Sequence, residues 1–201
     1  MLLEELKPKL HKDLIDALEK QKRSQDSIAI IEKAYEFAFQ KHINQTRRSG
    51  DAYITHPVTV AKTLIELKCD TPTICAGLLH DVLEDTETSI NEMKKNFGEV
   101  TYELVDGVTK LGKNCRKMLL AIAKDMRVVL VKLADRLHNM QTLQYLNDEK
   151  RYRIARETLD IFAPLANRFG LHAIKTELED LCFKHLYPEE FEKVKLLVSS
   201  K

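Results

Sequence analysis

The sequence predicts an all-α protein, on three observations. Apolar residues recur mostly at helical spacing along the chain. Only six Gly and five Pro punctuate 201 residues, so turn signals are sparse. Hydrophobic residues make up 44% and charged residues 31%, a composition typical of a globular domain. We therefore expect residues 1–201 to form a single domain, a helical bundle of about ten helices.

The first helices follow from apolar spacing and turn signals. A first helix is marked by leucines one turn apart, namely Leu10, Leu14 and Leu18. A second is marked by Ile28, Ile31, Tyr35 and Ala38. We expect its cap at Ser24 or Asp26, since both side chains accept hydrogen bonds from free backbone N–H groups. Residues 43–55 break the periodicity and predict a polar loop. Pro57 and Pro72 each suit the first turn of a helix.

The later helices follow in the same way. Ser89 is expected to open a helix that stops near Gly98. Residues 115–143 are expected to be helical, although residues 128–131 (VVLV) alone resemble a buried strand. Helix is favoured because the apolar pattern continues through Leu133, Leu137 and Met140. Two more helices are expected over roughly residues 149–168 and 171–186.

Charge and cysteine content exclude several classes of function. The net charge is only +1, so no global field favours DNA or a membrane surface as a partner. No apolar run approaches the ~18 residues of a membrane span, and the N-terminus lacks a signal peptide's apolar core. The four cysteines show no CxxC spacing and are expected to be reduced core thiols: Cys69, Cys75, Cys115 and Cys182. These features predict a cytoplasmic protein.

Four residues supply a nitrogen and oxygen ligand set suited to a divalent metal that activates water: His56, His80, Asp81 and Asp135. In LLHDVLEDT, an apolar helix ends in a cluster of imidazole and carboxylate groups. Burying that much charge requires a compensating cation or a solvent-filled cleft. The same segment carries an acidic pair, Glu84 and Asp85, and an earlier segment carries the basic pair Arg47 and Arg48. The combination indicates a hydrolase for a phosphorylated substrate.

Spacing alone leaves simpler interpretations open. The LLHDVLEDT segment also fits an ordinary solvated helix end. His56 fits a helix cap or a surface residue, and Asp135 fits an ion pair with Arg136 or a facing lysine. Arg47 and Arg48 fit a solvated pair of charges in a loop.

Longer motifs narrow these alternatives. The segments RRSGDAYITHP, AGLLHDVLEDT, ELVDGVTKL and KLADRLHNMQTL resemble the HD-type hydrolase domain of the RelA/SpoT family, the enzymes of the alarmone (p)ppGpp. The segment ARETLDIFAPLANRFGLHAIKTELEDLCFKHLYP resembles the closing helices of that domain. The resemblance covers roughly residues 28–190 in order. It implies one HD-type alarmone hydrolase domain over residues 1–201, with the synthetase domain absent.

The resemblance also implies roles for particular residues. One divalent metal, usually Mn²⁺ in the family, would be held by His56, His80, Asp81 and Asp135. The catalytic acidic pair would be Glu84 and Asp85. The substrate contacts would be Arg47, Arg48, Ser49, Asn139 and Thr142. Four further histidines match no family ligand: His11, His42, His172 and His185. His138 is expected to be packed or capping.

The implied reaction is hydrolysis of the 3′-pyrophosphate of guanosine 3′,5′-bis(diphosphate) to GDP or GTP and pyrophosphate. The expected partners are this guanine nucleotide and a synthetase or regulatory region attached in a longer parent chain. Two alternatives remain. One is another HD phosphohydrolase, acting for example on deoxynucleotides or NADPH. The other is a module that binds the alarmone without turnover.

The sequence departs from the family pattern at one place. After VDGVTKLGK the chain passes at once to NCRKMLLAIAKD, where the family has a polar, charged stretch. We expect a segment to be missing between Lys113 and Asn114, since a polar loop beside a site is often unordered without substrate. The alternative is a true deletion, which would predict a constitutive hydrolase.

Overall fold

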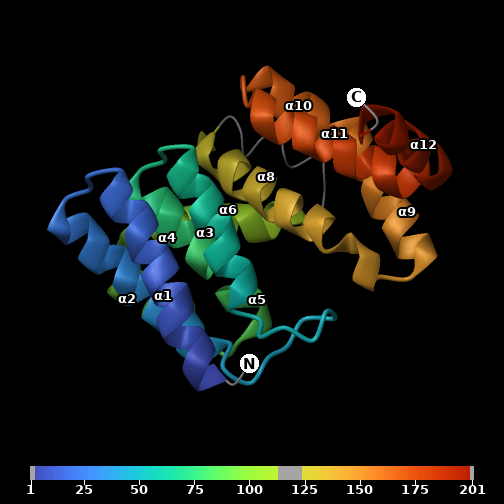
Figure 1. Cartoon of the computed structure of the whole chain (residues 1–201). Coiled ribbons are helices and arrows are strands. Elements are labelled where there is room, and N and C mark those ends of the chain that lie inside the picture. Colours follow the sequence, from blue (N-terminus) through green and yellow to red (C-terminus); the bar gives the residue numbers. More distant parts are fainter. Residues whose placement is uncertain (1–2, 113–123, 200–201) are drawn as a thin grey trace. The chain divides into compact units, whose positions relative to one another are not determined.

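The computed structural model describes residues 3–112 and 124–199 and is almost entirely helical in those stretches (Figure 1). Within them an isolated bridge between Thr46 and Ala52 is present and no strand forms. The all-α prediction is therefore confirmed. The chain divides into two compact units, Met1–Asp135 and Arg136–Lys201, which are described separately below. A single domain over residues 1–201 stays a prediction.

The first unit contains α1 (Leu3–Lys20), α2 (Gln25–Lys41), α3 (Thr55–Glu66), α4 (Thr71–Leu79), α5 (Val82–Asp85), α6 (Ile90–Gly112) and the larger part of α8 (Arg127–Gln141). The predicted cap of α2 is confirmed at Ser24, whose side chain accepts a hydrogen bond from the Ser27 N–H. Pro57 and Pro72 lie in the first turns of α3 and α4, as expected. Residues 128–131 are helical, so the strand alternative is excluded.

Helix α4 lies at the centre of this unit and packs against α2, α3 and α6. It is apolar on all sides, with no exposed surface at Ile74, Cys75, Ala76, Leu78 and Leu79. A helix that is hydrophobic all round must be enclosed by other elements. Because α4 ends at Leu79, the next two residues, His80 and Asp81, emerge directly from the core.

Helix α6 is interrupted at Gly98. Ser89 opens it by accepting a hydrogen bond from the Glu92 N–H at 3.1 Å, as predicted. At Gly98 the backbone takes φ 81°, a conformation that favours glycine, and the helix is interrupted at the predicted place without ending there. The helix then resumes and continues to Gly112, which the sequence analysis did not anticipate. Buried Leu104 and Val105 tie this second part to the core.

The second unit contains the end of α8 (residues 136–141), η1 (Leu143–Tyr145), α9 (Asp148–Glu157), the π-helical segment η2 (Thr158–Phe162), α10 (Ala163–Arg168), α11 (His172–Leu186) and α12 (Pro188–Ser199). The helix expected over residues 149–168 is thus interrupted by η2. There the Ala163 N–H bonds to the Thr158 carbonyl, and the next residue, Pro164, has no N–H to donate. The helix expected over residues 171–186 corresponds to α11. Helix α12 was not anticipated.

Three of the four cysteines, Cys69, Cys75 and Cys182, are buried free thiols, as expected. Cys115 and the junction between Lys113 and Asn114 lie outside the described residues, so the expectation of a missing segment stays a prediction. Among the helices that the structure describes, none has the length and apolar character needed to cross a membrane.

Candidate metal centre

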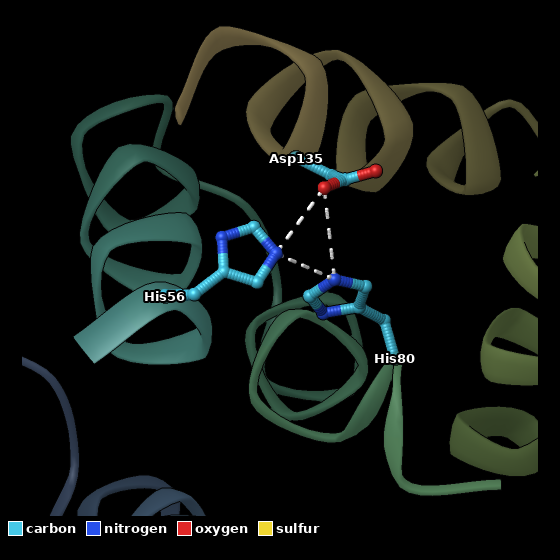
Figure 2. Close-up of side chains that lie close together, drawn as sticks. All are labelled: His56, His80 and Asp135. Carbon is cyan, nitrogen blue, oxygen red and sulfur yellow. Dashed lines mark hydrogen bonds and ion pairs between the residues drawn. The ribbon is translucent and has the colours of Figure 1, made fainter. Parts of the chain in front are cut away.

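Three of the predicted metal ligands meet inside the first unit. His56 lies in the first turn of α3, His80 directly follows α4, and Asp135 lies on α8 (Figure 2). The Nε2 atom of His56 lies 3.2 Å from His80 Nε2 and 3.2 Å from Asp135 Oδ1. His80 Nε2 and Asp135 Oδ1 are 3.8 Å apart. All three residues are buried, although they come from segments far apart in the sequence.

These separations fit ligands of one ion. Two atoms bonded to a common metal at about 2.1 Å lie roughly 3.0–3.4 Å apart, for bond angles between octahedral and tetrahedral. Two of the three separations above fall in that range, and the third exceeds it by a few tenths of an ångström. The cluster of His56, His80 and Asp135 is thus compatible with a divalent metal.

The fourth predicted ligand, Asp81, reaches the same cluster. Its Oδ2 atom lies 3.2 Å from His80 Nε2 and 3.6 Å from His56 Nε2. Asp81 is adjacent to His80 in the sequence and precedes the short helix α5. The structure therefore brings all four predicted ligands together, in a set of two imidazoles and two carboxylates that divalent metals accept.

The backbone of α4 fixes the orientation of the His80 ring. Its Nδ1 atom lies 2.8 Å from the carbonyl oxygen of Gly77. Only a protonated Nδ1 can donate to that carbonyl, so Nε2, which faces Asp81 and Asp135, is the nitrogen that could bind a metal after losing its proton. Hydrogen bonds of this kind orient histidine ligands in metal proteins. Gly77 also lets α4 approach α3, since a Cβ atom there would lie 2.5 Å from the Leu64 Cδ1 atom.

Substitution Gly77→Ala should therefore disturb both the packing and the site. The added methyl group must displace Leu64 between α3 and α4, and overpacking of a core typically costs about 1–3 kcal/mol. We expect the free energy of unfolding to fall by that amount in a urea titration, and divalent metal affinity to fall as well because the Gly77 carbonyl orients His80. Unchanged stability of Gly77→Ala would contradict the close approach of α4 to α3.

The charges around the cluster favour a cation within it. Burial alone would lower the pKa of His80, but Asp81 and Asp135 raise it to about 9. Burial lowers the pKa of His56, and the charge on His80 adds to that effect. Burial would raise the pKa of Asp81, yet His80 holds it well below its usual value. The two carboxylates thus stay ionised and attract positive charge at the point where the Nε2 atoms converge.

Lys132 holds the remaining oxygen of Asp135. Its Nζ atom lies 2.6 Å from Asp135 Oδ2, three residues apart on α8, while Oδ1 faces the histidines. Burial would raise the pKa of Asp135, but Lys132 and His56 hold it well below its usual value. Arg136, the arginine named as an alternative partner of Asp135, instead pairs with Glu157 at 3.0 Å. Lys132 was not predicted as the lysine partner, although its spacing from Asp135 places both on one helix face.

The predicted acidic pair, Glu84 and Asp85, lies on α5 and is exposed. A tyrosine connects this pair to the metal ligands. The Tyr53 hydroxyl lies 2.6 Å from Asp81 Oδ2 and 2.9 Å from Asp85 Oδ2. Tyr53 lies within RRSGDAYITHP, but the sequence predicts no role for it, because a loop residue has no periodicity to mark the direction of its side chain.

The loop over residues 43–55 carries three of the predicted substrate contacts. Arg47 and Ser49 are half-buried and Arg48 is exposed. The loop is closed by hydrogen bonds, including Arg47 N–H to the Asp51 carbonyl at 2.8 Å and Ser49 Oγ to Asp51 Oδ2 at 2.8 Å. The other two, Asn139 and Thr142, belong to the second unit, where the Thr142 hydroxyl donates to the His138 carbonyl at 3.1 Å. All five substrate contacts stay predictions.

Comparison with known proteins places this geometry in a family. A family model described as "HD domain" matches residues 34–114 and 112–172. The two stretches meet where the sequence departs from the RelA/SpoT pattern. The match includes all four predicted metal ligands and the acidic pair.

Curated relatives are similar over most of this chain. It is 54% identical over 177 residues to a guanosine-3′,5′-bis(diphosphate) 3′-pyrophosphohydrolase of Aquifex aeolicus, covering 84% of this chain and 25% of the relative. It is 50% identical over 188 residues to the bifunctional (p)ppGpp synthase/hydrolase SpoT of Escherichia coli, covering 88% and 27%. The chain thus spans about a quarter of the length of these curated relatives.

A solved structure supports the same assignment. It is of a metazoan ortholog of SpoT described as hydrolysing ppGpp, and it matches with a TM-score of 0.59 and 29% identity. The match covers 78% of this chain and 94% of that chain. With the family match, the relatives and the His-Asp cluster together, this chain belongs to the HD domain family and, within it, to the RelA/SpoT type.

Proposed function

We propose that this chain catalyses metal-dependent hydrolysis of the 3′-pyrophosphate of ppGpp and pppGpp, giving GDP or GTP and pyrophosphate. The observation that carries the proposal is the buried cluster of His56, His80 and Asp135, with Asp81 beside it. Relatives at 54% and 50% identity are named for this reaction or for a bifunctional enzyme that includes it, while others at 51% are named GTP pyrophosphokinase. The partner is then a guanine nucleotide. An attached synthetase or regulatory region belongs to the same proposal, since the relatives are longer.

We propose Mn²⁺ as the metal and His56, His80, Asp81 and Asp135 as its ligands. When bound, a divalent metal there would act as a Lewis acid toward a phosphoryl oxygen and make water more acidic. The donor set of two nitrogens and two carboxylates fits Mn²⁺, but it also accepts Fe²⁺ or Zn²⁺. The choice of Mn²⁺ rests on the family resemblance.

The roles proposed for the other residues follow from their chemistry. Glu84 and Asp85 are exposed carboxylates, able to accept a proton from attacking water. Arg47 is a guanidinium on the neighbouring loop, suited to stack on a purine or to bind phosphate oxygens in a bidentate manner. That loop is tied to the acidic pair, since the Gln45 side chain donates to the Asp85 carbonyl at 2.7 Å. Phosphate recognition and proton transfer thus involve adjacent elements.

One assay separates this proposal from its two alternatives. The purified chain is incubated with Mn²⁺ and, separately, with ppGpp, deoxynucleoside triphosphates and NADPH, and the products are identified chromatographically. We expect GDP and pyrophosphate from ppGpp and little turnover of the others. Preferred hydrolysis of a deoxynucleotide or NADPH would indicate a different HD phosphohydrolase. Binding of ppGpp without products, in the Mn²⁺-loaded protein, would indicate a sensing module.

Substitution Arg47→Ala should weaken substrate recognition. A charge-assisted contact to phosphate or base is worth about 1–3 kcal/mol, which corresponds to roughly a 5–150-fold rise in KM for ppGpp. Because Arg47 is not among the proposed ligands, the Mn²⁺ content should stay unchanged. Arg153→Ala, at an exposed position on α9, is the matched control. An unchanged KM in Arg47→Ala would show that Arg47 does not bind the substrate and would favour the alternative of a solvated charge in the loop.

A further inference from the structure

The Tyr53 hydroxyl lies between two carboxylates with different proposed roles, one in metal binding and one in proton transfer. It is within hydrogen-bond distance of Asp81, a proposed metal ligand, and of Asp85, a member of the acidic pair. Both partner atoms are carboxylate oxygens, and an ionised carboxylate accepts hydrogen bonds but donates none. A phenol carries a single proton, so the two carboxylates compete for it. The hydrogen bond to one carboxylate therefore weakens as the other becomes the better acceptor.

The tyrosine ring is held in place on two sides. The ring of His42 stacks against it with centroids 4.6 Å apart and planes 22° apart. The ring of His56 meets its edge, with centroids 6.2 Å apart and planes at 84°. His42 is buried and had no predicted role. With its ring so fixed, Tyr53 presents its hydroxyl at one position, between Asp81 and Asp85.

Asp85 is held at two points from the same loop. The Gln45 side-chain amide donates to its backbone carbonyl at 2.7 Å, and the Gln45 side-chain oxygen lies 2.7 Å from His42 Nδ1. Tyr53 reaches its carboxylate at 2.9 Å. His42, Gln45 and Tyr53 thus form a support that orients the exposed carboxylate of Asp85 relative to the buried cluster. Without such a support an exposed aspartate side chain would sample several rotamers.

We propose that Tyr53 is a positioning residue that couples metal binding at Asp81 to the orientation of the Asp85 carboxylate. The inference rests on the proposed function and deepens it. With a cation held at Asp81, that carboxylate would be the weaker hydrogen-bond acceptor. The Tyr53 hydroxyl would then donate chiefly to Asp85 and orient its carboxylate for proton transfer. Burial and the two carboxylates raise the pKa of Tyr53 far above its usual value, so the phenol keeps its proton in the metal-free site.

The test uses Tyr53→Phe, which keeps the ring and its contacts with His42 and His56 but removes the hydroxyl. The matched control is Tyr35→Phe, since Tyr35 is a buried tyrosine of α2 whose hydroxyl donates to the Lys7 carbonyl at 2.8 Å. Each is made with and without Asp85→Asn. Folding is compared by urea unfolding. Two quantities are measured on every variant: Mn²⁺ affinity of chelator-stripped protein by calorimetry, and kcat and KM for ppGpp.

We expect Tyr53→Phe to lower kcat by about 10-fold or more, because Asp85 loses the hydroxyl that orients it, a loss on the scale seen when an outer-shell partner of a metal site is removed. Mn²⁺ binding should become tighter, because no hydroxyl then competes for Asp81. KM should change little, since Tyr53 is not among the proposed substrate contacts. Asp85→Asn alone should weaken Mn²⁺ binding, because the hydroxyl then keeps Asp81 as its acceptor, and it should have less effect when combined with Tyr53→Phe. The losses in kcat should likewise be smaller than the product of the separate factors, because both changes break one link. Tyr35→Phe should leave both quantities near wild type.

Two results would overturn the inference. One is a Tyr53→Phe variant that matches Tyr35→Phe in Mn²⁺ affinity and kcat. The other is a double variant in which the separate effects on Mn²⁺ affinity and on kcat multiply fully. A wild-type chain that binds Mn²⁺ but does not hydrolyse ppGpp would instead remove the proposed function. In that case the Mn²⁺ affinities alone test whether Tyr53 couples to metal binding, and the same two results, read for affinity only, would overturn the inference.

Discussion

Substitution Asp81→Ala is expected to abolish both metal binding and hydrolysis while leaving a folded helical protein. Asp81 Oδ2 lies 3.2 Å from His80 Nε2, so its removal takes a carboxylate from the point where the histidines converge. Loss of a Lewis acid that contributes about 4 kcal/mol to transition-state stabilisation corresponds to a fall of roughly 10³-fold in kcat/KM. Metal content, measured by elemental analysis, should fall from one Mn²⁺ per chain to a small fraction.

The control for this prediction is Asp106→Ala. Asp106 also bears a carboxylate in an ion pair, with Lys110 on α6, but it is not part of the cluster. It should keep its full metal content and activity. Circular dichroism distinguishes loss of metal from loss of fold in Asp81→Ala. One Mn²⁺ per chain in a folded Asp81→Ala variant would exclude Asp81 as a ligand and leave the cluster with His56, His80 and Asp135.

The combined substitution Glu84→Gln with Asp85→Asn should separate binding from chemistry. The metal ligands and Arg47 are untouched, so at saturating Mn²⁺ both the metal content and ppGpp binding should persist. Hydrolysis should slow by about 10²-fold or more, the usual contribution of a group that accepts a proton in the transition state. The two steps are measured separately, binding by calorimetry with a short incubation and turnover by pyrophosphate release.

The matched control for that variant is Glu99→Gln with Asp106→Asn. These two carboxylates lie on α6, where they pair with Lys94 and Lys110, so the charge change is the same. Near-wild-type turnover in the control and slow turnover in the Glu84 and Asp85 variant would support the assignment. If the latter variant turns over as fast as wild type, the acidic pair is structural and the proposed proton acceptor is wrong.

Helix positions were largely predictable from the sequence because apolar periodicity reports burial. Residues 128–131 show how: alone they resemble a strand, but the pattern continuing to Met140 favours a helix, and α8 confirms it. The errors arose where backbone chemistry changes inside a periodic stretch. Gly98 interrupts α6 without ending it. The helix predicted over residues 149–168 is interrupted by the π-helical segment η2, just before Pro164, which has no N–H to donate. A glycine or proline in the sequence does not show whether the helix continues beyond it.

The identities of the candidate ligands were predictable, but their convergence was not. The nitrogen and oxygen ligand types and the family motifs indicated His56 and Asp135, which lie on α3 and α8. From spacing alone, His56 also fitted a helix cap or surface residue, and Asp135 an ion pair. Because α3 and α8 pack into the same hydrophobic core, His56 Nε2 and Asp135 Oδ1 come within 3.2 Å of each other. Lys132 could have been found from its spacing of three residues from Asp135. Tyr53 could not, since its direction depends on the fold of a loop closed by tertiary contacts.

The central claim is that this chain breaks the bond between the ribose 3′ oxygen and phosphorus by metal-dependent attack of water on that phosphorus. The most direct measurement is hydrolysis of ppGpp in ¹⁸O-labelled water, with products analysed by mass spectrometry, in Mn²⁺-loaded and in chelator-stripped protein. We predict one ¹⁸O atom in pyrophosphate, none in GDP, and turnover only with metal. Orthophosphate as the product, label in GDP, or equal rates in the stripped protein would contradict the account.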